Sequence, residues 1–209
     1  MSVDGAATHQ GLSGGLSDAA DKRVFDILRR LCDVVLVGAG TVRAEGYSAM
    51  RVDEVSERHR MAHGMTAHPV FAIVSASLDL DPASPIFTEA PERPIVFTTE
   101  LSRPDTRDAL AEVADVLIFG RDRVEAGQMI QALADRGLSR IHCEGGPHLL
   151  GDLIASRVLD ELCLTLSPRL EAGVATRITA GASPINPVGL RLAHTLVAGE
   201  TLLLRYVRA

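Results

Sequence analysis

Short apolar runs alternate with helical patterns along most of this chain, and that alternation restricts the folds it can adopt. The run Val34-Val35-Leu36-Val37 is rich in β-branched residues and stops at Gly38, which is typical of a buried strand. Strands that alternate with helices predict a mostly parallel sheet with helices on both faces. The other predicted strands are Val70–Val74, Pro94–Thr98, Val116–Phe119, Arg140–Glu144 and Glu161–Leu166.

Helical spacing of apolar residues predicts the elements between these strands. Ser17 can cap a first helix, in which Val24, Leu28 and Leu31 recur at helical spacing. The polar segment 48–68 is expected to be a surface loop or a short helix. The later helices are predicted at Thr106–Val113, Val124–Arg136 and Pro147–Ser156.

The end of the chain has a different pattern. Leu190–Val197 and Thr201–Val207 flank Ala198-Gly199-Glu200, which predicts an antiparallel hairpin. We therefore expect a single α/β domain over residues 1–209, with a mixed, mostly parallel sheet and this hairpin at its edge.

Composition and charge exclude several classes of protein. With 46% hydrophobic residues in 209, the chain is too apolar to be disordered and long enough to bury a core. Its 27 acidic and 21 basic residues argue against nonspecific binding to nucleic acid or anionic lipid. We find no apolar run near the ~18 residues of a membrane helix, and no signal segment at the start. We expect a soluble, cytoplasmic protein with no nucleic-acid or membrane partner.

The cysteines and neighbouring histidines do not suggest a disulfide or a metal. Cys32, Cys143 and Cys163 are odd in number and widely spaced, and each lies in an apolar run, so buried thiols are expected. His142 and Cys143 are neighbours on a predicted strand, so they point to opposite faces even though His148 follows. We predict no metal site.

Two glycine-rich segments each follow a predicted strand and precede a helix, namely Gly38–Gly46 and Glu144–Gly151. Glycine at a strand end lets the backbone approach a ligand, and a helix N-terminus offers free N–H groups to phosphate. Either segment alone is more often a tight turn than a ligand site, but two on neighbouring strands would suit a dinucleotide. Glu144 closes an apolar strand just before Gly145, where a carboxylate is costly unless it is paired or faces a cleft.

Several motifs then carry a family resemblance. They are Ser2-Val3-Asp4-Gly5, Ser17 with Ala20-Asp21 and Leu28-Arg29, Val37-Gly38-Ala39-Gly40-Thr41-Val42, Glu144-Gly145-Gly146-Pro147 with Leu149 and Gly151, and Leu159-Asp160-Glu161-Leu162. Over nearly the whole chain they resemble the reductase domain of riboflavin biosynthesis, and stand-alone pyrimidine reductase-like proteins most of all. The resemblance implies a dihydrofolate reductase-like three-layer fold. It also implies NADPH-dependent reduction of 5-amino-6-(5-phosphoribosylamino)uracil to its ribitylamino form. A reductase of a pterin, dihydrofolate or another heterocycle, and a non-catalytic NADP-binding paralogue, are the alternatives.

The resemblance also implies roles for individual residues. Thr41 and Glu45 would line the nicotinamide, and Ser75 or Ser77 would approach the adenosine 2′-phosphate. The cofactor pyrophosphate would lie against Gly145, Gly146, Pro147, His148, Leu149, Leu150 and Gly151. The substrate would contact Ser13, Arg29, Arg51 and Glu144, with the arginines suited to its phosphate. Glu144 is the candidate catalytic residue, and either Glu144 or a bound water could donate the proton.

Three expectations concern the cofactor, the assembly and the start of the chain. NADPH is favoured over NADH because Ser75 and Ser77 follow a strand that carries no acid for a ribose hydroxyl. The apolar run Leu202–Leu204, on an expected edge, predicts a homodimer with the hairpin near the interface. The family has a full strand before Ser2, and its loss would cost several kcal/mol, so we expect a truncated first strand and about ten or more residues before Met1.

Overall fold

The computed structural model describes residues 1–181 and 187–209, and they form two compact units. One unit is Asp26–Gly145, and the other joins Met1–Phe25 to Gly146–Ala209. Helix α1 (Ala19–Leu31) begins in the second of these and ends in the first. In the described part of the chain, no helix has the length and apolar character needed to cross a membrane.

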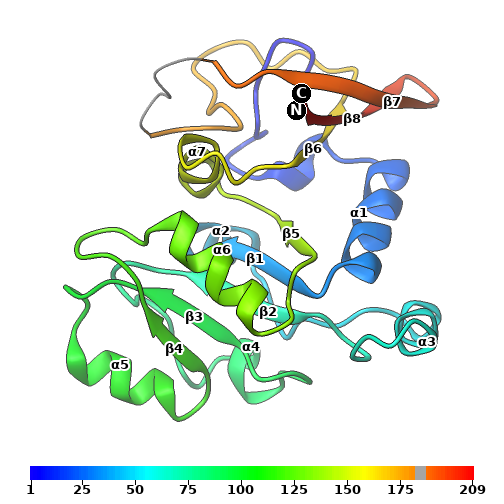
Figure 1. Cartoon of the computed structure of the whole chain (residues 1–209). Coiled ribbons are helices and arrows are strands. Elements are labelled where there is room, and N and C mark those ends of the chain that lie inside the picture. Colours follow the sequence, from blue (N-terminus) through cyan, green and yellow to red (C-terminus); the bar gives the residue numbers. More distant parts are fainter. Residues whose placement is uncertain (182–186) are drawn as a thin grey trace. The chain divides into compact units, whose positions relative to one another are not determined.

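The unit Asp26–Gly145 is built on a five-stranded parallel sheet in the order β4-β3-β2-β1-β5 (Figure 1). Its strands are β1 (Val34–Gly38), β2 (Val70–Val74), β3 (Ile95–Thr98), β4 (Asp115–Ile118) and β5 (Ile141–Cys143). Its other helices are α2 (Ala39–Glu45), α3 (Glu54–Ala62), α4 (Pro85–Thr88), α5 (Pro104–Ala111) and α6 (Ala126–Asp135). The α/β class and the parallel pairing predicted from the alternating pattern are confirmed, with strand ends shifted by a residue or two.

The core of this unit lies on both faces of the sheet. Val34 to Val37 of β1 are all 0% exposed, as expected for a central strand covered on both sides. Val35 and Val37 pair with Phe71 and Ile73 of β2, and this face packs against Ile86 and Phe87 of α4. The chain moves along the sheet one way from β1 to β4 and returns to β5. Right-handed crossovers therefore place α6 on the opposite face from α4 and α5.

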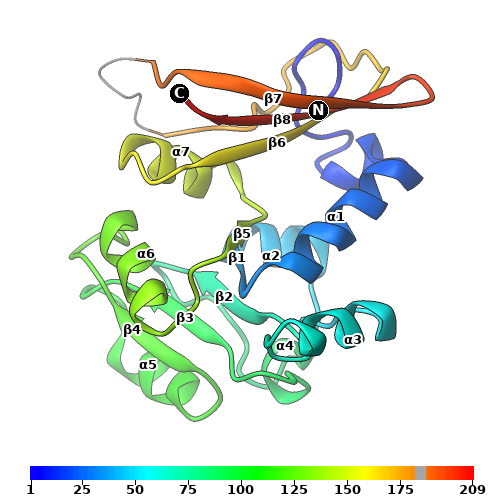
Figure 2. The ribbon, with the colours of Figure 1, turned by 45° about the vertical axis from the view of Figure 1, so that its right-hand side comes forward.

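The second unit contains an antiparallel sheet in the order β6-β8-β7 (Figure 2). Its elements are the 3-10 helix η1 (Ser13–Leu16), α7 (Pro147–Ala155), β6 (Glu161–Leu166), β7 (Leu190–Ala198) and β8 (Thr201–Arg208). The predicted hairpin is confirmed as β7 and β8, but it pairs with β6 in a sheet separate from the five-stranded one. The run Leu202–Leu204 lies on the central strand β8, so its expected edge position is wrong and β7 is an edge instead.

The start of the chain forms a tight turn beside the end of β6. Ser2 bridges to Ser167, and the Ser2 backbone N–H and hydroxyl both contact the turn that it opens. Asp4 accepts hydrogen bonds from the Ser2 hydroxyl at 2.5 Å and from the backbone N–H of Ala172 at 2.8 Å. The Ser2–Gly5 motif is therefore a structural turn whose carboxylate holds the segment after β6.

Two local expectations are corrected by the structure. The cap of α1 is Asp18, whose Oδ1 accepts from the Asp21 N–H at 2.8 Å, because Ser17 instead terminates η1. Cys32 is buried and Cys143 half-buried, but Cys163 is exposed. An apolar run on a strand of a small sheet still presents alternate side chains outward, so the run around Cys163 did not bury it. In the segment 48–68, α3 forms with Asp53 as its cap.

Candidate active site

The two glycine-rich turns emerge side by side from neighbouring strands. Strand β1 pairs in parallel with β5, and the Gly38 N–H donates to the Gly145 carbonyl at 2.7 Å. Strand β1 is also where the chain reverses its direction along the sheet, with β2 on one side and β5 on the other. Open α/β sheets bind ligands at the carboxyl ends of strands at such a switch point. The neighbouring turns predicted from the sequence are therefore confirmed, at the edge where a ligand is expected.

A buried carboxylate follows β5 at this edge. The Glu144 side chain is 1% exposed. Its Oε1 accepts from Arg29 Nε at 2.7 Å, and its Oε2 accepts from Arg29 Nη2 at 2.8 Å. A bidentate arginine of this kind offsets much of the cost of burying the charge. Arg29 and Glu144 were each predicted to contact the substrate, and in the structure they bind each other.

Tyr47 is a third member of the cluster, which the sequence analysis missed. Its hydroxyl donates to Glu144 Oε2 at 2.6 Å, and the Arg29 guanidinium lies 5.8 Å from the centre of its ring. The ring of Phe71 on β2 stacks on the Tyr47 ring, with ring centroids 5.8 Å apart. Burial, and then the neighbouring Glu144 charge, raise the pKa of Tyr47, so its hydroxyl stays protonated and keeps donating. No local signal connects Tyr47 to Glu144, because the two residues are 97 positions apart in the chain and only the fold brings them together.

His142 lies near the same carboxylate. Its Nε2 is 3.5 Å from Glu144 Oε1, and its side chain is mostly buried. Burial lowers the pKa of His142 despite the nearby carboxylate, so the ring is neutral around pH 7. The formal charges of the cluster are therefore one guanidinium and one carboxylate, with a phenol and an imidazole as polar neighbours.

The remaining predicted residues of this unit have diverse surroundings. Thr41 and Glu45 lie on α2, half-buried, just after the first glycine turn. Ser75 is buried where β2 ends and donates its N–H to the Phe97 carbonyl, whereas Ser77 is exposed and accepts from Asp79 N–H at 3.4 Å. Arg51 is exposed and donates to the Glu89 carbonyl at 2.7 Å, so it is not part of the Glu144 cluster.

The residues after Gly145 belong to the second unit and form the start of α7. Gly146 is the N-cap of α7 and has no side chain with which to cap the helix. Pro147 takes the first helical position. The first N–H groups of such a helix have no intrahelical partner and lie at the positive end of its dipole. Leu149 is buried, and a Cβ at Gly151 would lie 2.0 Å from the Ala180 carbonyl oxygen, so these two have packing roles.

Two other predicted site residues of the second unit lie at its surface. His148 and Ser13 are exposed, the latter at the first position of η1. Gly146 has a φ of −81°, a value open to any residue, whereas Gly145 has a φ of +85° and requires glycine for its backbone. Within the described ranges, no group of three or more His, Cys, Asp or Glu side chains is placed to hold a metal ion.

These features define an α/β protein with a polar site at the carboxyl edge of a parallel sheet, flanked by two glycine turns. The chain belongs to the RibD C-terminal domain family, which matches residues 1–204. This confirms the family that the motifs indicated.

Individual relatives agree with the family. A 2,5-diamino-6-ribosylamino-4(3H)-pyrimidinone 5′-phosphate reductase from Methanothermobacter thermautotrophicus is 26% identical over 211 residues, covering 99% of this chain and 94% of that protein. A reductase of the same name from Aquifex aeolicus is 27% identical, over 97% and 91%. The crystal structure of a pyrimidine reductase-like protein from Corynebacterium diphtheriae covers all of this chain and 89% of its own, with a TM-score of 0.91 and 25% identity. By their names the curated relatives are oxidoreductases, and a reductase family implies a nicotinamide cofactor.

Proposed function

We propose that this protein reduces a 6-(5-phosphoribosylamino)pyrimidine in riboflavin biosynthesis, with NADPH as the reductant. The observation that carries the proposal is Glu144, buried by Arg29 and Tyr47 where two glycine turns meet. The motifs favour 5-amino-6-(5-phosphoribosylamino)uracil as substrate. This substrate is a uracil and has an oxygen at C2. The curated relatives are named for a pyrimidinone with an amino group at C2 instead, so that pyrimidinone is the second substrate to test.

The cofactor would supply a hydride to C1 of the opened ribose, and the protein would hold and orient the reactants. We assign the pyrophosphate to Gly145, Gly146 and the first turn of α7, which offers N–H groups and a positive dipole end. Gly40 supports close approach of a ligand at the first turn. It costs α2 about 1 kcal/mol relative to alanine, yet a Cβ there would meet nothing within 4 Å. Ser75 is the better candidate for contact with the 2′-phosphate, since it directly follows the carboxyl end of β2.

Glu144 acts in this proposal as a fixed negative charge and acceptor for the substrate. Its two oxygens already accept from two guanidinium N–H groups and a phenol, an arrangement suited to the ionised carboxylate. A bound water is therefore the better proton donor. Because Arg29 is committed to Glu144, we assign the substrate phosphate to Arg51, which donates to one exposed backbone carbonyl that it can leave.

The test is NADPH oxidation by the purified protein with each of the two pyrimidines, repeated with NADH. We expect turnover with at least one pyrimidine and a higher kcat/KM with NADPH. Glu144→Gln should remove most of the activity, while Glu161→Gln is the matched control, since Glu161 is also paired with an arginine but on β6. Cofactor binding without turnover of either pyrimidine would refute the proposal and favour the non-catalytic paralogue.

We also propose that the protein is a homodimer that pairs through the β7–β8 hairpin. Leu196 and Val197 on the edge strand β7 are 51% and 71% exposed, and Leu202 opposite Val197 is 36% exposed. Exposed apolar positions beside a free strand edge are a liability unless they are covered. Val197→Glu should convert a dimer to a monomer in light scattering, whereas Val55→Glu, at a similarly exposed valine on α3, should not. A wild-type monomer at micromolar concentration would contradict this.

A further inference from the structure

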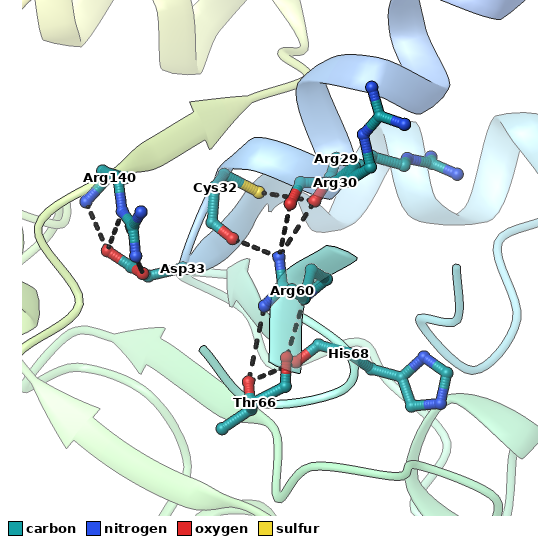
Figure 3. Close-up of polar contacts among 8 residues, drawn as sticks. All are labelled: Arg29, Arg30, Cys32, Asp33, Arg60, Thr66, His68 and Arg140. Carbon is teal, nitrogen blue, oxygen red and sulfur yellow. Dashed lines mark hydrogen bonds and ion pairs between the residues drawn. The ribbon is translucent and has the colours of Figure 1, made fainter. Parts of the chain in front are cut away.

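A fully buried arginine lies beneath the end of the helix that carries Arg29. Arg60 of α3 is 0% exposed. Its Nη1 donates to the backbone carbonyls of Arg29 and Arg30, each at 3.2 Å, and to that of Cys32 (Figure 3). These carbonyls belong to the last turn of α1 and the residue beyond it, where the helix leaves acceptors without partners.

The rest of the guanidinium is held by the loop after α3. Arg60 Nε donates to the Thr66 carbonyl at 2.9 Å, and Nη2 donates to the Thr66 hydroxyl at 3.4 Å. The Thr66 hydroxyl in turn donates to the His68 carbonyl. Arg60 thus bridges the loop after α3 to the C-terminus of α1, as Figure 3 shows.

The sequence offers no ordinary end signal for α1. Leu31 is followed by Cys32 and Asp33, with no glycine to reverse the chain and satisfy the last carbonyls. A cation at this end also interacts favourably with the negative end of the helix dipole. Burying a guanidinium is costly, so a cap of this kind needs several well-placed acceptors, and α1 provides them.

The helix end that Arg60 caps is the one that aims Arg29 at Glu144. The Arg29 carbonyl accepts from Arg60, while its side chain makes the bidentate contact with the carboxylate. A bidentate fork tolerates little displacement of its backbone. The partner strand is anchored as well, because Arg140, just before β5, donates its N–H and Nε to Asp33 at 2.8 and 3.1 Å.

We propose that Arg60 is a positioning residue for the site, which fixes the end of α1 so that Arg29 holds Glu144 in place. The activity part of this inference rests on the proposed reductase function. The positioning part can be read in the protein alone.

The chain supplies a matched control in Arg93. Arg93 donates to the carbonyls of Ala111 and Ala114 at 2.7 and 3.0 Å, and so caps the end of α5. It is half exposed and its ion-pair partner is Asp115, which is not a predicted site residue. Arg60→Met and Arg93→Met therefore both remove an arginine helix cap, but only the first removes one beneath Arg29.

The first readout needs no substrate. The chain has two tyrosines and no tryptophan, so in a Tyr206→Phe background the near-ultraviolet circular dichroism of tyrosine reports Tyr47. We expect Arg60→Met to change this band in the same sense as Arg29→Lys, and Arg93→Met to leave it unchanged. An unchanged Tyr47 band in a folded Arg60→Met variant would overturn the proposal.

The second readout is kcat/KM for the pyrimidine. We expect Arg60→Met to lower it at least tenfold and Arg93→Met to change it less than threefold. The Arg29→Lys, Arg60→Met double variant should be no less active than Arg29→Lys alone, because both act through one contact. Additive losses would overturn the proposal. If wild type shows no turnover, the proposed function fails, and the Tyr47 band alone decides the role of Arg60.

Folding of the variants is checked by urea unfolding. If Arg60→Met does not fold, Arg60→Lys, which keeps the charge but not the fork, takes its place and should show the same changes in smaller degree. If neither folds, Arg60 is required for the fold as a whole, and its assignment as a positioning residue is wrong.

Discussion

Replacing Tyr47 with phenylalanine isolates one hydrogen bond to the buried carboxylate. The substitution removes the hydroxyl that lies 2.6 Å from Glu144 Oε2, while the ring keeps its stacking on Phe71. A hydrogen bond to a charged group contributes about 1.5–3 kcal/mol net. Since about 1.4 kcal/mol is a factor of ten, kcat/KM should fall by roughly 10- to 100-fold if the position of Glu144 limits the reaction. The free energy of unfolding should fall by no more than about 3 kcal/mol.

The assay compares Tyr47→Phe with Tyr206→Phe, which alters the chain's other tyrosine on β8. Both variants are measured by urea unfolding and by steady-state NADPH oxidation. The two substitutions should also be coupled, so that Tyr47→Phe adds little to the loss already caused by Glu144→Gln. A folded Tyr47→Phe variant with wild-type kcat/KM would show that the hydroxyl does not help to place the carboxylate.

Three further predictions concern stability and reactivity. Gly151→Ala should lower the free energy of unfolding by about 1–3 kcal/mol, because its Cβ would lie 2.0 Å from the Ala180 oxygen. The control is Gly127→Ala on α6, whose Cβ would meet nothing within 4 Å, so this variant should be neutral or stabilising. Equal urea midpoints for the two variants would contradict this prediction. The Ser2 hydroxyl, then the Ala172 and Glu171 N–H groups, lower the pKa of Asp4 from 3.8 to about 2, so its stabilisation is present above pH 3.8 and is lost as the pH falls toward 2. Asp4→Asn should therefore be less stable than wild type at neutral pH, with a gap that closes in this window, and a gap independent of pH would refute the assignment. Burial raises the pKa of Cys32 to about 12 and that of Cys163 to about 11, so both thiols are mostly protonated at pH 8 and access to the sulfur decides between them. The exposed Cys163 should therefore be alkylated before the buried Cys32, as mass spectrometry of peptides can show, and early modification of Cys32 would mean that its segment opens readily.

The secondary structure was largely predictable because its causes are local. The β-branched run Val34–Val37 and the other apolar runs predict strands that are buried on both faces. Glycine and proline mark where strands and helices stop. The correction at Ser17 is of the same local kind, since two adjacent polar residues can each serve as a cap and the preceding 3-10 helix decides between them. The exposure of Cys163 was not predictable, because burial of a strand face depends on what packs against it.

The family motifs, the alternation of strands and helices, and the two glycine turns were determined by the sequence alone. Only the tertiary structure decided that β1 lies beside β5, that β8 is the centre of its sheet, and that Tyr47 and Arg29 meet at Glu144. It also placed Arg60 beneath a helix end about thirty residues earlier in the chain. Apolar periodicity states how each segment meets a core, but it does not state which segments meet each other. This long-range packing determines which buried polar groups contact each other. Burying either partner costs free energy unless the other is there to bond it.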